Sequence, residues 1–130
     1  MQEFQVAVVD ADTPGEKIAV TGVKYDIGKP RFDLLPPAAL MEVAAVYSYG
    51  AKKYAARNWE NGMDWGRVYA ATQRHLHSYW GGQDIDEESG LPHLAHATFG
   101  LLTLITFATT HPELDSRLTA LSEAVAVAAL

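Results

Sequence analysis

Four of the chain's five histidines fall within one short stretch, RHLHSYWGGQDIDEESGLPHLAH, at positions 74–96. His93 and His96 are three residues apart, so on a helix they share one face. A run of acids lies just upstream: Asp84, Asp86, Glu87 and Glu88. If this loop folds back over the first turn of the helix, its carboxylates and the imidazoles could converge on a cation.

The kind of cation depends on the balance of oxygen and nitrogen ligands. Oxygen-rich sites with a few imidazoles suit Mg²⁺ or Mn²⁺, whereas a pure set of histidines and carboxylates also suits Zn²⁺ or Fe²⁺. A plainer interpretation stands beside this one. Acids are favoured at helix N-termini by the helix dipole alone, and the histidines could simply hydrogen-bond. The spacing leaves both interpretations open.

Cationic and aromatic side chains elsewhere could hold a polyphosphate and stack on a base. Arg67 and Arg74 are seven residues apart on an expected helix and therefore share a face. The other cations are Lys24, Lys29, Arg31, Lys52 and Lys53, and the aromatic candidates are Tyr49, Tyr54, Trp59 and Trp65. Taken alone, each cation is more often a surface charge, and each aromatic residue more often fills a core or a helix contact.

Four helices are expected to position these residues, over about 37–56, 66–80, 91–109 and from 111 to the end of the chain. Pro37 and Pro92 suit first turns, and Gly81-Gly82 would end the second helix. Thr110-His-Pro-Glu113 matches a capping box for the fourth. The expected core stripe of the third helix is Leu94, Thr98, Leu101, Leu102 and Ile105. Short connections favour an all-α, antiparallel four-helix bundle.

The N-terminal residues read as extended. The runs FQVAVV and KIAVTGV are rich in β-branched residues, and DTPGE between them is a turn signal. The sequence therefore predicts an arm or hairpin over 1–24 and a helical bundle over 37–130, within a single domain of 130 residues.

The composition limits which classes of binding partner and which cellular locations are expected. The formal net charge of −6 argues against nucleic-acid binding as the main activity. No apolar run is long enough to span a membrane, and the chain has no secretory signal and no cysteine, so we expect a cytoplasmic protein. The apolar ending SEAVAVAAL needs cover, which predicts a homo-oligomer, either a dimer or a tetramer. Neither a P-loop nor a G-x-S-x-G elbow is present.

Two strings carry a family resemblance: GKPRFDLLPPAALMEVAAVYSYGAKKYAARNW and RHLHSYWGGQDIDEESGLPHLAHA. Over about residues 24–109 the chain resembles the phage dATP/dGTP diphosphohydrolase domain, a group that includes the MazG-like enzymes of phages that replace adenine with diaminopurine. The resemblance implies an all-α pyrophosphohydrolase that uses Mg²⁺ or Mn²⁺. It would convert a purine (d)NTP, with dGTP or GTP expected first, to the monophosphate and pyrophosphate. The alternatives are a pyrophosphohydrolase directed at dATP and a helical protein that binds nucleotide without turnover. In a phage-encoded protein the compartment would be the host cytoplasm.

The resemblance also implies roles for particular residues. Classical MazG enzymes bind metal through E-x-x-E and E-x-x-D motifs, and this chain has no such pair. The expected metal ligands are therefore Glu42, Asp84, Asp86, Glu88 and His96. The expected catalytic residues are Glu88, His93 and Asp86, with Glu88 or His93 taking the proton of the attacking water. The expected substrate-binding residues are Lys29, Arg31, Lys52, Lys53, Tyr54, Asn58, Trp59 and Arg74.

Overall fold

The computed structural model describes residues 21–118 and 127–129. The chain divides into two compact units, Met1–Leu35 and Pro36–Leu130. In the described part of the first unit, Lys29 N donates to Asp26 O at 3.0 Å across a turn in which Gly28 has φ 79°. A 3₁₀ helix, Phe32–Leu34, follows. The expected arm falls mostly on residues 1–20, outside the described residues, so it stays a prediction.

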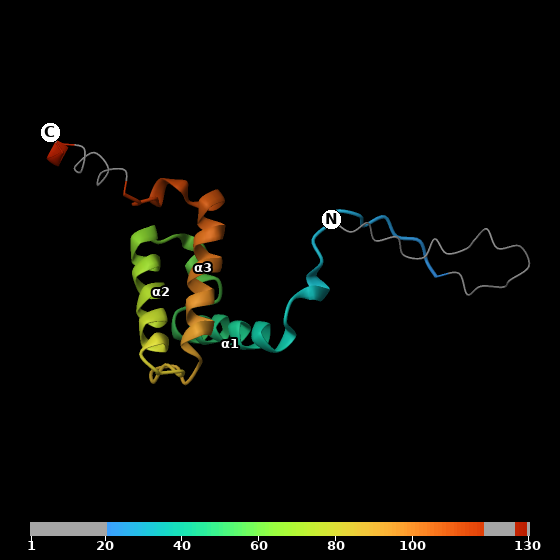
Figure 1. Ribbon diagram of the computed structural model, residues 1–130, viewed down its shortest axis with the longest axis horizontal. Helices are drawn as coiled ribbons and strands as arrows, with labels where there is room; N and C mark the ends of the chain where they lie inside the picture. Colours follow the sequence, from blue (N-terminus) through green and yellow to red (C-terminus); the bar gives the residue numbers. More distant parts are fainter. Residues whose placement is uncertain (1–20, 119–126, 130) are drawn as a thin grey trace, which may run out of the picture. The chain divides into compact units, whose positions relative to one another are not determined.

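The second unit contains three described α-helices: α1 Pro37–Lys53, α2 Trp65–Trp80 and α3 His93–Thr110. Figure 1 shows α2 and α3 side by side, with α1 crossing them near the end where the α2–α3 connection lies. Short 3₁₀ helices, Asn58–Asn61 and Pro112–Leu114, flank these elements. Residues 21–118 contain no strand and only the isolated bridge between Ile85 and Pro92. The all-α prediction is confirmed for the described residues.

The helix ends have local causes. Pro37 occupies the first turn of α1, where the missing N–H costs nothing. Asp64 caps α2, because its carboxylate accepts from Arg67 N at 3.2 Å. Gly81 ends α2, and its N–H donates to His77 O at 2.9 Å. These three boundaries lie close to those expected.

The buried face of α3 is not the expected leucine stripe. Ala97, Gly100, Thr103 and Phe107 are buried, whereas Leu94, Leu101, Leu102 and Ile105 are 42, 51, 39 and 69% exposed. The reason is the close approach of α2. A Cβ on Gly100 would overlap the Thr72 hydroxyl, so this contact between α2 and α3 has no room for a larger residue at position 100. Hydrophobicity alone therefore indicated the wrong side of this helix.

The expected start of the fourth helix is also wrong. Thr110 is the last residue of α3, and its hydroxyl donates to Thr106 O at 3.2 Å instead of capping a new helix. The chain continues as the 3₁₀ helix Pro112–Leu114 and then without helix through residue 117. Most of the remaining segment, 119–126 and 130, lies outside the described residues, so a four-helix bundle is not confirmed. None of the described helices is long and apolar enough to cross a membrane.

Candidate functional site

The α2–α3 connection folds back over the first turn of α3, as expected. Asp86 N donates to Leu91 O at 2.8 Å, Gly90 N donates to Asp86 O at 2.8 Å, and His93 N donates to Asp84 O at 2.9 Å. Gly90 has φ 72°, a conformation that favours glycine at this tight turn. The bond from His93 N gives an acceptor to an N–H that has no partner within α3, because His93 is its first residue. The fold therefore fixes Asp86 beside the first turn of α3.

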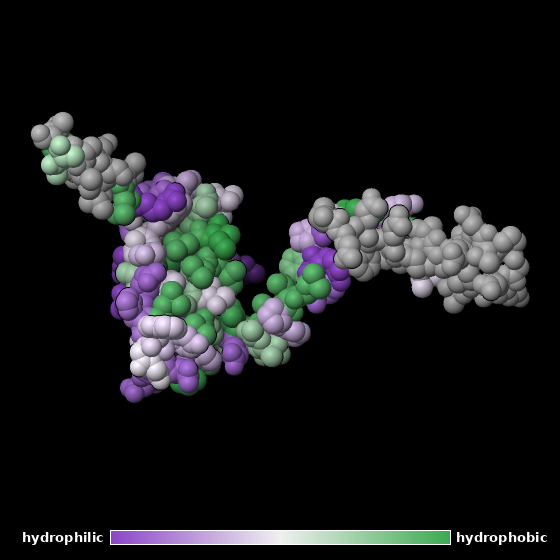
Figure 2. Space-filling model, in the orientation of Figure 1, coloured by the Kyte–Doolittle hydropathy of each residue, from purple (hydrophilic) through white to green (hydrophobic). Residues whose placement is uncertain are grey.

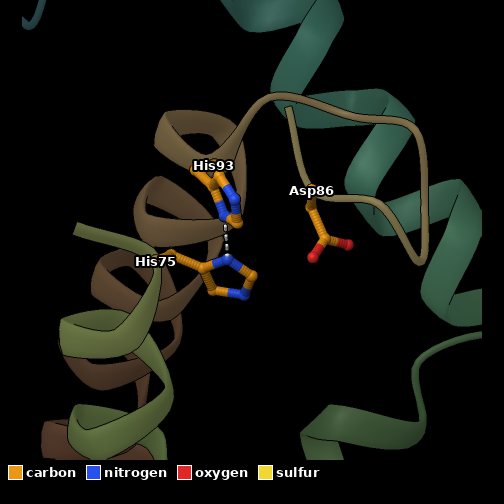
Figure 3. Close-up of side chains that lie close together, drawn as sticks. All are labelled: His75, Asp86 and His93. Carbon is orange, nitrogen blue, oxygen red and sulfur yellow. Dashed lines mark hydrogen bonds between the residues drawn. The ribbon is translucent and has the colours of Figure 1, made fainter. Parts of the chain in front are cut away.

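Three side chains converge there from three different segments (Figure 3). His75 comes from α2, Asp86 from the connection and His93 from the first turn of α3. One ligand atom from each lies within 4.8 Å of the others, which makes this the group in the described part of the chain that could hold a metal ion. His75 Nδ1 and His93 Nδ1 are 2.8 Å apart. We refer to these three residues as the His-Asp cluster.

The partner of His93 fixes where its proton lies. Its Nε2 is 3.1 Å from Gln83 Oε1, and an amide oxygen only accepts hydrogen bonds. His93 Nε2 therefore donates, and neutral His93 carries its lone pair on Nδ1. Of the two nitrogens that face each other, His75 Nδ1 must supply the proton. The lone pair of neutral His75 then lies on Nε2.

Ser89 fixes a second imidazole in the same way. Its hydroxyl donates to Asp86 Oδ2 at 2.8 Å and lies 2.7 Å from His96 Nε2. Because the single hydroxyl proton goes to the carboxylate, His96 Nε2 must donate and its Nδ1 must carry the lone pair. The His96 ring stacks on the His75 ring, with centroids 4.5 Å apart and planes 8° apart.

Burial favours the neutral form of these imidazoles. It lowers the pKa of His75 and of His96, and the neighbouring imidazoles lower that of His75 further. Burial acts in the opposite direction on Asp86, but the hydrogen bonds from Ser89 and the nearby imidazoles outweigh it, so the pKa of Asp86 is lowered. At neutral pH, His75 and His96 thus offer uncharged nitrogens beside the ionised oxygen of Asp86, and these are the protonation states that bind metal.

Glu88 faces α1 instead of the His-Asp cluster. Its Oε1 accepts from Lys53 Nζ at 2.6 Å and from Tyr49 Oη at 3.1 Å. The hydrogen bond from Lys53 lowers the pKa of Glu88, and the same contact raises the pKa of Lys53. A carboxylate stabilised in this way is a weak base. Its clearest effect is to join the end of α1 to the α2–α3 connection.

A cavity of about 990 Å³ lies between the three helices, and Asp86, Glu88, His75 and His96 are on its wall. Arg67 and Arg74 of α2 also line it, and neither guanidinium has an ion-pair partner among the described residues. Trp59 contributes an aromatic surface, held edge-on by Tyr47 at a centroid distance of 5.9 Å. One open space therefore brings together cations, an aromatic ring and the His-Asp cluster.

The structure brings together many, but not all, of the residues expected to act. Those that line the cavity are Lys53, Tyr54, Asn58, Trp59, Arg74, Asp86, Glu88 and His96. His93 is buried against His75. Glu42, Lys52 and Asp84 are exposed and do not line the cavity. Lys29 and Arg31 belong to the first unit. The chemical roles of all these residues stay predictions.

Sequence reasoning did not single out His75 or Gln83. A signal for His75 exists: Val68, Thr72 and His75 follow the i, i+4, i+7 spacing of an inward helical face, and the first two are buried. The bond from Gln83 to His93 spans ten residues and depends on the course of the connection. Helical periodicity therefore had no means of finding it.

Comparison with known proteins agrees with the resemblance. A family model described as "dATP/dGTP diphosphohydrolase, N-terminal" matches residues 19–117. A protein of Salmonella phage PMBT28 named dATP/dGTP diphosphohydrolase is 37% identical over 98 residues, which are 75% of this chain and 33% of that protein. The chain thus spans about a third of this relative's length. No solved structure matches the chain. With most of its length matched, the chain belongs to the dATP/dGTP diphosphohydrolase family, in the region described as N-terminal.

Proposed function

We propose that this protein is a MazG-like pyrophosphohydrolase. It hydrolyses a purine deoxynucleoside triphosphate, with dGTP preferred, to the monophosphate and pyrophosphate. The reaction depends on a divalent metal ion, for which Mg²⁺ and Mn²⁺ are the expected choices. The name of the phage relative, dATP/dGTP diphosphohydrolase, supports the substrate class. The preference for guanine rests on the resemblance to the enzymes of diaminopurine phages.

The observation that carries this proposal is the shared cavity. Its volume of about 990 Å³ suits a nucleotide, since small-molecule sites span roughly 300–1,000 Å³. Arg67 and Arg74 offer planar, permanently charged groups to phosphate oxygens. Trp59 offers a face to a base, and Asn58 offers an amide for the base edge. If the triphosphate lies between these arginines and the His-Asp cluster, the base would lie next to Trp59.

The cluster fits a divalent ion because ionised oxygen and neutral nitrogen donors lie together. Such an ion would add positive charge at the phosphates and lower the pKa of a bound water. The cations of α2 hold the leaving pyrophosphate and offset its charge. Water attacks the α-phosphorus, the bond to the α,β-bridging oxygen breaks and pyrophosphate departs in line.

The proton of the attacking water goes to His96 in this proposal. Of the two bases expected from sequence, Glu88 is held by Lys53, and the lone pair of His93 faces His75. His96 lines the cavity and has its Nδ1 lone pair unused by Ser89. His96 is therefore the general base of the proposal, with Ser89 and Asp86 positioning its ring.

The test incubates the purified protein with each common dNTP and NTP, with Mg²⁺, Mn²⁺ or EDTA, and separates the products by ion exchange. Metal-dependent formation of a purine monophosphate and pyrophosphate is expected, fastest with dGTP. Release of orthophosphate or triphosphate would contradict the reaction class. Faster turnover of dATP would contradict the guanine preference. Nucleotide binding without any product would favour a non-catalytic nucleotide-binding protein instead.

Two neighbouring acids provide a matched pair of variants. Asp86→Asn removes a carboxylate of the cluster, and we expect turnover to fall by at least about 100-fold. Glu87→Gln removes the same charge from the same connection, but Glu87 is exposed and does not line the cavity. We expect this control to keep wild-type turnover. Equal losses in both variants would mean that general charge matters and that the cluster does not.

We also propose that the protein forms a homo-oligomer through α3. Figure 2 shows apolar side chains gathered over this helix. Leu101, Leu102 and Ile105 are 51, 39 and 69% exposed, which is unusual for adjacent large aliphatic side chains. A second copy would cover this face. Light scattering coupled to size-exclusion chromatography gives the mass, and a monomer at all concentrations would contradict the proposal.

A further inference from the structure

The contact between His75 and His93 joins two ring nitrogens of the same kind. Their Nδ1 atoms face each other across 2.8 Å (Figure 3), so one shared proton must separate two nitrogen lone pairs. A divalent cation can replace that proton and be bound by both nitrogens. His75 would then carry its own proton on Nε2. The pair is thus arranged to hold a positive charge between its rings.

The surroundings of the cluster have the form of an outer shell around a metal site. Ligating histidines usually donate their second N–H to a fixed oxygen, and ligating carboxylates are usually hydrogen-bonded as well. His93 donates to Gln83 Oε1 at 3.1 Å. Asp86 Oδ2 accepts from Ser89 N at 3.0 Å and from Ser89 Oγ at 2.8 Å. Within the described part of the chain, Asp86 Oδ1 accepts no hydrogen bond and is available to a cation.

We propose that His75, His93 and Asp86 bind a first-row transition-metal ion and select it over Mg²⁺. This inference rests on the proposed function for the part the ion plays in hydrolysis, but binding itself is measured without nucleotide. Two imidazoles and one carboxylate suit Mn²⁺, Fe²⁺, Co²⁺ or Zn²⁺, whereas Mg²⁺ prefers oxygen ligands. Three protein ligands leave coordination positions for water and phosphate oxygens.

The alternative is a purely structural hydrogen bond between two core histidines. That alternative does not explain the free-energy cost of packing these polar side chains together. Three imidazoles and a carboxylate are packed together where apolar side chains would fill the space without any polar groups to satisfy. A bound cation accounts for this cost, and Asp86 Oδ1 on the cavity wall is accessible to it.

The first experiment measures metal binding by the full chain after treatment with a chelator. Isothermal titration with MnCl₂, CoCl₂ or MgCl₂ reports affinity, and pulsed electron paramagnetic resonance of the Mn²⁺ form reports nitrogen ligands. We expect one tight site per chain, Mn²⁺ and Co²⁺ binding at least about 100-fold tighter than Mg²⁺, and ¹⁴N couplings from two imidazoles. Equal affinity for Mg²⁺ and Mn²⁺, or an Mn²⁺ signal without ¹⁴N coupling, would overturn the proposal.

Histidine variants then test the assignment. His75→Gln and His93→Gln should each lower Mn²⁺ affinity by about 10- to 100-fold or more and remove one of the two nitrogen couplings. His77→Gln is the matched control, because His77 lies on the same helix but is exposed and does not line the cavity. Unchanged couplings in His75→Gln, or an equal loss in the control, would refute the assignment.

A fourth variant covers the case in which loss of a buried histidine prevents folding. Gln83 is exposed, so Gln83→Leu should leave the circular dichroism spectrum unchanged, yet it removes the partner that fixes the His93 tautomer. We expect a loss of Mn²⁺ affinity of about 10-fold. Wild-type affinity in this variant would count against the cluster. Tight Mn²⁺ binding without nucleotide hydrolysis would refute the proposed function alone, and hydrolysis without the nitrogen-ligated site would refute this inference alone.

Discussion

Gly100 lies at a close contact between α2 and α3, and replacing it with Ala tests the packing that brings the histidines together. A Cβ at this position would overlap Thr72 Oγ1 and approach Thr72 Cβ to 3.1 Å. Thr72 is 2% exposed, and its hydroxyl donates to Val68 O at 2.8 Å, so its side chain has little room to turn away. The two helices must therefore separate, and His75 would move relative to His93.

The size of the effect follows from two opposing terms. Overpacking of a well-packed core costs typically up to about 3 kcal/mol, and this overlap lies at the severe end. Replacing Gly by Ala inside a helix stabilises the helix by about 1 kcal/mol. The expected net loss is about 2 kcal/mol, which for a unit of this size lowers Tm by roughly 8–16 °C.

Urea and thermal unfolding followed by circular dichroism measure this change. Gly50→Ala is the matched control, because Gly50 is also helical but nothing lies within 4 Å of its added Cβ. That variant should gain up to about 1 kcal/mol from helix propensity. Adding Thr72→Ala to Gly100→Ala should recover part of the loss, since the overlapping hydroxyl is removed. Equal stability of the two single glycine variants would refute the reasoning.

Three further predictions concern the cavity wall, the apolar face and a histidine outside the cluster. Arg74→Met should lower kcat/KM by about 10- to 100-fold through loss of a charge-assisted phosphate contact, whereas Lys52→Met, which removes an exposed charge away from the cavity, should not. Ile105→Glu should shift the mass measured by light scattering toward the monomer, because it places a charge on the exposed apolar face of α3. His111 donates from Nε2 to a backbone carbonyl at 2.7 Å and from Nδ1 to Glu113 at 2.9 Å, and these bonds raise its pKa. The stabilisation from protonated His111 is therefore fully present below the unfolded-state pKa of about 6.5, and it is lost as pH rises through the folded-state pKa. The difference in unfolding free energy between wild type and His111→Gln should shrink as pH rises, and a constant difference would contradict this assignment.

The positions of the three helices were predictable because their signals are local. Proline in a first turn and glycine after a last turn mark ends within the sequence itself. Which face of α3 is buried was not predictable from hydrophobicity. That choice depends on how closely α2 approaches, and Gly100 and Thr72 meet only in the folded chain. The leucines were expected inside because their transfer to an apolar interior is favourable, yet close helix contact requires small residues.

Only part of the site was predictable, because only some of its contacts are local in sequence. Asp86 and His93 lie close together in sequence, so the turn between them could be expected to bring them together. His75 enters from another helix, and its contact with His93 spans 18 residues. Glu42 was expected as a metal ligand from the resemblance, but among the described residues it is not part of the His-Asp cluster. Long-range contacts of this kind follow from the packing of α2 against α3.

In the proposed reaction, water attacks the α-phosphorus of a purine deoxynucleoside triphosphate bound in the cavity. Hydrolysis of dGTP in H₂¹⁸O with Mn²⁺, followed by ³¹P NMR of the products, tests it directly. We expect ¹⁸O in dGMP and none in pyrophosphate. Label in pyrophosphate would show attack at the β-phosphorus, and labelled orthophosphate would show attack at the γ-phosphorus. Either of these results, or no turnover, would contradict the proposed reaction.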